Sequence, residues 1–205
     1  MKRALFHARQ HGLAAVEFAL LLPILLMLLF GMIDAARALQ ANIIITNISR
    51  EGANLVARGN TPLDTGSQDI IYALMASAPP LNVNQQGMVY ITRVMGVVRN
   101  GITSSVVLDQ YRWDDAARGL GFAANAYKPI SKVYNCTAWS SGGKCTGFSN
   151  NSRPGVDIMK GKLDDGEVVH VVETFYHYDM LLTSAATGAL SLPTIGPDLY
   201  SMTIF

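Results

Sequence analysis

An apolar run near the N-terminus constrains this chain more than any other feature. The 21 residues from Leu13 to Ile33 contain a single charged side chain, Glu17. As a helix they would rise roughly 31 Å, enough to cross a bilayer core of about 30 Å. A carboxylate inside such a span is costly, so Glu17 needs a reason to be there, such as a partner amine. The run therefore predicts a membrane-spanning helix with one functional carboxylate.

The residues before the run predict its orientation. Lys2, Arg3 and Arg9 form a basic tail, and basic residues that flank a first helix favour the cytoplasmic side. We therefore expect residues 1–12 to be a cytoplasmic leader and residues 13–33 to cross the membrane. Everything after Ile33 is then extracytoplasmic.

The same segment resembles a known family. A basic leader, Gly12, and Glu17 five residues later within an apolar helix resemble the processing site of type IV pilins and pseudopilins. The continuation AAVEFALLLPILLMLLFGMIDAARALQ, followed by Ser49-Arg50-Glu51-Gly52-Ala53, resembles the TadE/TadF-like pseudopilins of the tight-adherence (Flp, type IVc) pilus system. This resemblance covers roughly residues 9–58.

The resemblance implies a function in pilus assembly. A prepilin peptidase would cut between Gly12 and Leu13, and Glu17 would pair with an N-terminus during assembly. The protein would be a minor pilin with a single pass through the bacterial inner membrane. Its partners would be other pilins and pseudopilins, the prepilin peptidase, the inner-membrane assembly platform and the lipid bilayer.

Two other interpretations of the N-terminus stay open. In a plain signal anchor, Glu17 would lie near the headgroups or favour the positive start of the helix. Alternatively, Ala36-Arg37-Ala38 matches the A-x-A pattern of a signal-peptidase site, and cleavage after Ala38 would release a secreted binding domain or enzyme. Against this, the apolar run from Phe18 to Ile33 is slightly long for a signal peptide, and helical patterning continues through the site.

Beyond the membrane run, apolar residues recur at roughly helical spacing, which predicts an amphipathic stem over residues 34–58. These residues are Ile33, Ala36, Ile44, Ile48, Leu55 and Val56. Gly59-Asn60-Thr61-Pro62 supplies a stop signal. We therefore predict one helix from Leu13 to Arg58, with a membrane half and a supporting half.

Residues 59–205 predict an extracytoplasmic α+β head. A capping box at Thr65-Gly66-Ser67-Gln68 would begin a short helix, and Asp114 to Lys128 would be loop with some helix. The Asn100-Gly101 pair favours a type I′ turn in a hairpin. The expected elements are a helix over Gln68–Ser77 and strands over Met88–Val98, Ile102–Trp113, Glu167–Tyr178 and Leu199–Phe205. Together they predict a small antiparallel sheet of four or five strands, whose apolar face the stem covers.

Cys136 and Cys145 are the two cysteines of the chain. In an exported domain we expect them to form a structural disulfide. A CxxC-type redox pair does not fit the eight residues between them, and two thiols alone cannot complete a structural zinc site.

Nothing in the head indicates an enzyme, a cofactor or a metal site. His170 should point away from Glu173, His177 and Asp179 on a strand, and a solvated strand face explains those three. The chain lacks the HExxH, GxSxG, P-loop and dinucleotide glycine motifs. Its 16 basic residues are scattered among 15 acidic ones, so no nucleic-acid partner is expected. We therefore predict a non-enzymatic assembly protein.

Overall fold

The computed structural model describes residues 11–58, 63–122, 127–148, 152–181 and 197–205. The chain divides into two compact units, which are described separately. The first contains residues 1–39 and 179–195, and the second contains residues 40–178 and 196–205. The leader residues 1–10 lie outside the described part.

One helix, α1 (His11–Ala57), supplies 47 residues and is roughly 70 Å long. It continues through Pro23 and through the Ala36-Arg37-Ala38 segment without a break. The predicted helix, Leu13–Arg58, agrees with it to within two residues at each end. Among the described residues, α1 is the one helix long and apolar enough to cross a membrane.

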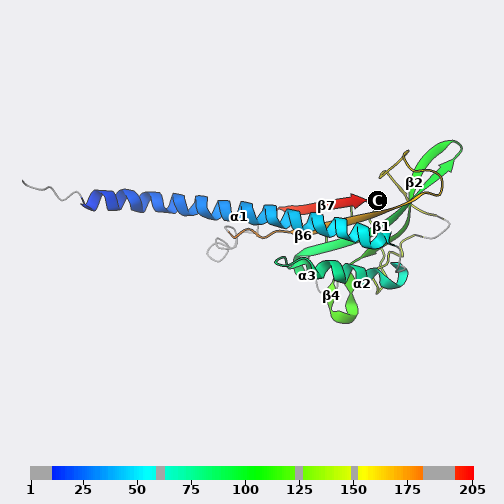
Figure 1. The fold of residues 1–205 in the computed structure, drawn as a ribbon, viewed down its shortest axis with the longest axis horizontal. Coiled ribbons are helices and arrows are strands. Elements are labelled where there is room, and N and C mark those ends of the chain that lie inside the picture. The colour runs from blue at the N-terminus through cyan, green and yellow to red at the C-terminus, as the bar shows by residue number, and fades with distance from the viewer. Residues whose placement is uncertain (1–10, 59–62, 123–126, 149–151, 182–196) are drawn as a thin grey trace, which may run out of the picture. The chain divides into compact units, whose positions relative to one another are not determined.

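The second unit is built around a five-stranded antiparallel sheet (Figure 1). Its strands lie in the order β5-β2-β1-β6-β7. Their bounds are β1 (Gly87–Arg99), β2 (Ile102–Arg112), β5 (Gly155–Val156), β6 (Val168–His177) and β7 (Asp198–Ile204). The α+β prediction is confirmed, and the four long strands lie where the sequence predicted them.

The turn between β1 and β2 has the predicted chemistry. Asn100 and Gly101 both have positive φ, 54° and 75°. A type I′ turn requires this at both central residues, and Asn and Gly tolerate it best. The local sequence therefore determines this hairpin.

The part of α1 in the second unit packs on the sheet. Its buried apolar positions are Ala41, Ile45, Ile48, Ala53 and Val56. The Ser49 hydroxyl donates to Thr174 Oγ1 of β6 at 2.9 Å. A Cβ on Gly52 would lie 2.9 Å from Leu74 and 3.1 Å from Val172, so this glycine permits the close approach of helix and sheet. This packing confirms the predicted amphipathic stem, but Ile45, which was not among the predicted apolar positions, is fully buried, whereas the predicted Ile44 is half-buried.

One local prediction was wrong. It concerns α2 (Leu63–Ala76), because the supposed capping box lies inside this helix instead of at its start. In the stretch after the hairpin, predicted as loop with some helix, β3 (Asp114–Asp115) and β4 (Leu120–Gly121) form a small second sheet around the 3-10 turn η1 (Ala116–Arg118). A short helix, α3 (Val83–Gln86), precedes β1. Tertiary contacts such as Gln68 Oε1 accepting from the Asp114 N–H at 2.9 Å override the local signals here.

Strand register sorts the side chains onto two faces. The first face carries Val89, Ile91, Tyr111, Val172 and Thr174, and α1 and α2 cover it. The opposite face carries Tyr90, Thr92, Gln110, Arg112 and Glu173, and residues 129–148 contribute its cover. We call this second surface the polar face, because it collects most of the polar side chains buried in the sheet.

Candidate assembly helix and the polar face of the head

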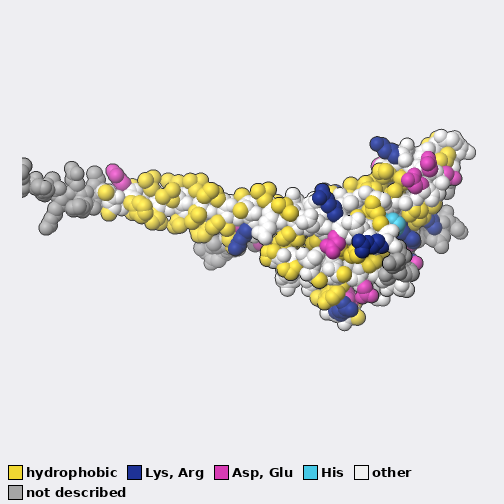
Figure 2. Space-filling model, viewed as in Figure 1, with side chains coloured by type: hydrophobic (Ala, Val, Ile, Leu, Met, Phe, Trp, Pro, Cys, Tyr) yellow, Lys and Arg dark blue, Asp and Glu magenta, His cyan; other side chains and the backbone are white. Residues whose placement is uncertain are grey.

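The N-terminal half of α1 exposes its apolar side chains on all sides. Between Val16 and Ile33 the exposed fraction of the large apolar side chains ranges from 36% at Ile33 to 70% at Leu20. Figure 2 shows hydrophobic side chains along the visible face of this segment. An apolar surface this continuous is unusual for a soluble monomer and marks a membrane or protein interaction site. The helix is therefore a candidate membrane anchor.

Glu17 is exposed in this otherwise uncharged segment. Within the described part of the chain it makes no hydrogen bond and no ion pair. Gly12 and Leu13 have helical backbone. Leu13 lies four positions before Glu17, which is about 6 Å along a helix axis. The helix thus places the predicted cleavage site one turn from the carboxylate.

A second carboxylate of the first unit, Asp34, has a different environment. It is 5% exposed, and its Oδ1 accepts the backbone N–H of Leu181 at 2.9 Å. Asp34 is the first residue of the predicted stem, residues 34–58, and no role was predicted for it. Its partner comes from 147 residues further along the chain, so no local signal could have revealed it.

Glu173 overturns the prediction of a solvated strand face. It is completely buried in β6 on the polar face. Its Oε1 accepts the Lys132 N–H at 2.9 Å and the Tyr200 O–H at 3.1 Å, and its Oε2 accepts the Ser131 hydroxyl. Burial raises the pKa of Glu173 above its ordinary value, although these donors partly offset the effect. The predicted alternation of side chains along the strand was correct. The sequence did not show that residues 129–148 would cover this face.

The two histidines of this strand lie on opposite faces, as predicted. His170 stacks on Phe205 with ring centroids 5.4 Å apart, and burial lowers its pKa. On the other face, His177 Nδ1 lies 2.7 Å from Asp198 Oδ1. Because β6 ends at His177, Asp179 is not part of the strand. The described residues contain no group of three or more His, Cys, Asp or Glu side chains placed to hold a metal.

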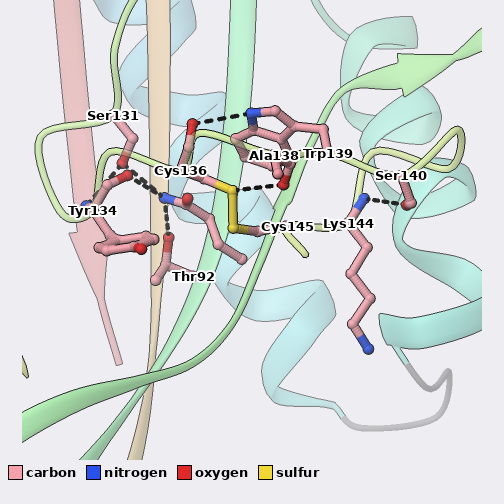
Figure 3. The surroundings of a disulfide bond; sticks show 10 residues. Thr92, Ser131, Tyr134, Cys136, Ala138, Trp139, Ser140, Lys144 and Cys145 are labelled. Carbon is pink, nitrogen blue, oxygen red and sulfur yellow. Dashed lines mark hydrogen bonds between the residues drawn. A yellow bond between two sulfur atoms is a disulfide. The ribbon is translucent and has the colours of Figure 1, made fainter. Parts of the chain in front are cut away.

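Cys136 and Cys145 form a disulfide, with Cα atoms 6.0 Å apart, as expected from the sequence (Figure 3). The Trp139 indole N–H donates to the Cys136 carbonyl at 3.2 Å. The bridged loop is attached to the edge of β2, where the Cys145 N–H donates to the Gln110 carbonyl at 2.8 Å. The bridge therefore helps to hold the covering segment on the polar face.

Arg112 is a buried cation for which the sequence predicted no role. Its guanidinium carbon lies 3.3 Å from the centre of the Phe122 ring and 4.6 Å from that of Trp139. It also pairs with Asp114 at 2.8 Å, and the residue is 8% exposed. Burial raises the pKa of the neighbouring Tyr90 to about 12, and the Tyr90 hydroxyl donates to the Pro129 carbonyl at 2.6 Å. A cation between two aromatic rings is strongly favoured once it is desolvated.

Comparison with known proteins gives one match. The model of the TadE-like protein family matches residues 12–54. This range contains Gly12, Leu13 and Glu17 and ends within the part of α1 that packs on the sheet. It confirms the family resemblance found in the sequence, and the head lies beyond it. No curated protein and no solved structure shows significant similarity to the chain.

Proposed function

We propose that this protein is a TadE-like pseudopilin, or minor pilin, that takes part in assembling a tight-adherence pilus. The observation that carries the proposal is the family match over residues 12–54. The part of this segment up to Ile33 is an exposed apolar helix whose one carboxylate is Glu17. The TadE-like family is not an enzyme family, which supports an assembly role. The disulfide supports an oxidising, extracytoplasmic location for the head.

The proposed topology follows from the charges around α1. The leader, residues 1–12, is cytoplasmic and is removed by a prepilin peptidase after Gly12. Residues 13–33 span the inner membrane, residues 34–58 form the stem, and residues 59–205 form the extracytoplasmic head. Positive charge is retained on the cytoplasmic side, which supports this orientation.

Assembly proceeds by helix packing. The apolar side chains of residues 13–33 exchange lipid for the helices of neighbouring pilins when the subunit leaves the bilayer. Glu17 has no described partner inside the chain, so an amine from another subunit, such as a processed N-terminus, can satisfy it. Desolvation offsets much of the attraction between the two charges, so the pair mainly fixes the register of the packed helices.

The partners in this scheme are other pilins and pseudopilins, the prepilin peptidase and the inner-membrane assembly platform. Contacts between pilins would run along the exposed apolar half of α1. The head, beyond the family match, would supply the contacts specific to this subunit. No nucleic acid is required at any step.

The mature N-terminus tests the proposal. We expect mass spectrometry of the membrane-extracted protein to find a chain that begins at Leu13. Replacing Gly12 with Val should leave an uncleaved precursor in the membrane, because a bulky residue then occupies the cleavage site.

Gly31→Val is the matched control. A Cβ at Gly31 meets nothing within 4 Å, so this variant adds the same side chain to the same helix and should mature normally. A mature chain that begins at Leu39 would overturn the proposal in favour of a secreted protein released after Ala38. Normal maturation of Gly12→Val would contradict processing at Gly12.

A further inference from the structure

A cavity lies on the polar face of the head, beneath the disulfide-bridged loop. Its volume is about 170 Å³. Its walls include the rings of Tyr90, Phe122, Tyr134 and Trp139, and its cations are Arg112 and Lys128. A cavity of about 150 Å³ holds a benzene molecule, so this one has room for a single six-membered ring. The described residues that line it include no Asp or Glu.

Arg112, the buried cation of this cavity, has fewer partners among the described residues than its guanidinium can bind. Arg112 is 8% exposed, and Asp114 is its one described ion-pair partner. The Nε atom of Arg112 is buried and has no hydrogen-bond partner among the described residues. An Arg fork presents five N–H donors and suits a carboxylate, and Lys128 adds a second cation from an exposed position.

The aromatic rings that line the cavity are poorly arranged for stacking with nucleic-acid bases. Arg112 lies over the rings of Phe122 and Trp139, and Lys128 Nζ lies 5.0 Å from the centre of the Phe122 ring. Single-strand nucleic-acid sites need open ring faces on which bases can stack. Here cations already lie over the rings of Phe122 and Trp139, so at these two rings the cavity offers N–H donors in place of an open ring face. The matching chemistry is a compact anion attached to a small ring.

Two polar side chains at the rim of the cavity can form hydrogen bonds with the hydroxyl groups of a ligand. Asn135 is exposed and presents an amide, and Tyr134 is half-buried and presents a phenol. Amide and hydroxyl groups at the edge of a mostly apolar pocket typically fix a ligand's orientation. From the buried cation, the ring-sized volume and this rim, we propose that the cavity binds one uronic acid unit of an acidic polysaccharide. The carboxylate would meet Arg112 and Lys128, and the hydroxyls would meet the rim.

The test is a titration of the purified full chain, in detergent micelles, with D-glucuronate. Binding is measured by calorimetry and by the change in Trp139 fluorescence. D-glucose has the ring without the carboxylate, and acetate has the carboxylate without the ring. We expect glucuronate to bind roughly tenfold or more tightly than either, since each lacks one set of contacts. Trp139→Phe should remove most of the fluorescence response.

Lys128→Ala should weaken glucuronate binding roughly tenfold without affecting folding, because Lys128 is exposed. Lys160→Ala removes another exposed lysine that does not line the cavity and should bind like the wild type. Absence of saturable binding, equal binding of glucose or acetate, or tighter binding of an oligothymidylate would each overturn the proposal. Equal weakening by both lysine variants would also overturn it, because a non-specific charge effect would then explain the binding. Processing at Gly12 has no influence on this measurement, so its failure and that of the pilin proposal are distinguishable.

Discussion

Glu17 and Glu173 are both carboxylates within largely apolar elements, α1 and β6, yet their environments are opposite. Glu17 lies on the exposed apolar half of α1 and has no partner among the described residues. Glu173 is completely buried in the head and accepts hydrogen bonds from Ser131, Lys132 and Tyr200. Glu173 is satisfied within the fold, and the described part of the chain supplies no partner for Glu17.

From this difference we predict that Glu173 acts in folding and Glu17 in assembly. A buried polar group without partners costs about 1–3 kcal/mol, so a fold retains it only when donors are built around it. In the head those donors come from the covering segment and from β7. In the N-terminal half of α1, no part of the described chain supplies one. Variants of the two residues should therefore affect different measurements.

The largest expected effect is on assembly, from Glu17→Ala. The variant should insert into the membrane as well as the wild type or better, because a costly carboxylate is removed. It should no longer enter pili, because the partner for a neighbouring amine is gone. Pilus-dependent adherence and co-purification with other pilins measure this, and thermal unfolding of the head should not change.

Glu51→Ala is the matched control, since Glu51 is an exposed acid on the same helix. It should assemble normally. If the Glu17→Ala variant supports adherence and co-purifies with other pilins at wild-type yield, Glu17 is not needed for assembly, and the predicted difference between the two carboxylates is wrong.

The next effect belongs to the head alone. Replacing both Cys136 and Cys145 with Ser should lower the free energy of unfolding by roughly 2–3 kcal/mol, because a short loop is no longer closed in the unfolded chain. The β-rich fold should remain, since the hairpin and β6 supply the core. Thermal unfolding of the full chain in detergent measures the loss, and membrane insertion should not change.

Chemical reduction of the wild type provides the control and should give the same loss of stability. Thiol labelling of the denatured, unreduced protein tests the bridge directly. Two reactive thiols in protein taken from the exported compartment would contradict both the bridge and the proposed topology.

The smallest effect concerns the pH dependence of head stability. Because burial raises the folded-state pKa of Glu173 above its ordinary value of 4.5, the unfolded chain loses this proton first as pH rises. The contribution of Glu173 to the free energy of unfolding is therefore highest below pH 4.5. It falls as pH rises from there through the folded-state pKa. Glu173→Gln cannot ionise and should lack this decrease, as denaturant unfolding across the pH range would show.

Tyr200→Phe sharpens the same test. It removes one O–H donor to Glu173, which should raise the folded-state pKa further and enlarge the decrease in stability. Identical pH profiles for the wild type and Glu173→Gln would mean that Glu173 ionises alike in both states. Burial of Glu173 would then have no effect on its ionisation, and the predicted difference from Glu17 would not be supported by the free energy of unfolding.

Much of the fold could be predicted because its signals are local. The apolar run fixes α1, the Asn100-Gly101 pair fixes the β1–β2 turn, and the valine-rich segment fixes β6. The predicted site residues Gly12, Leu13 and Glu17 also came from the sequence, and the family match covers all three. Their roles in processing and assembly stay predictions.

The errors arose where distant segments decide the environment. Glu173 was expected to be solvated, because alternation along a strand does not show whether a face will be covered. The start of α2 was misplaced, because Gln68 bonds to the Arg112 carbonyl instead of capping a helix. Arg112 carried no signal of its own, since the rings that enclose it come from residues 10 and 27 positions further along.

The sequence by itself determined the elements of this protein: the apolar helix with its single carboxylate, the hairpin, the strands and the cysteine pair. Hydrophobic run length, alternation and turn chemistry depend on neighbouring residues, so they can be read along the chain. Only the tertiary structure decided which carboxylate is satisfied and where a cation-lined cavity forms. Those properties depend on burial and on groups brought together from distant positions, such as Glu173 and Ser131, which are 42 residues apart.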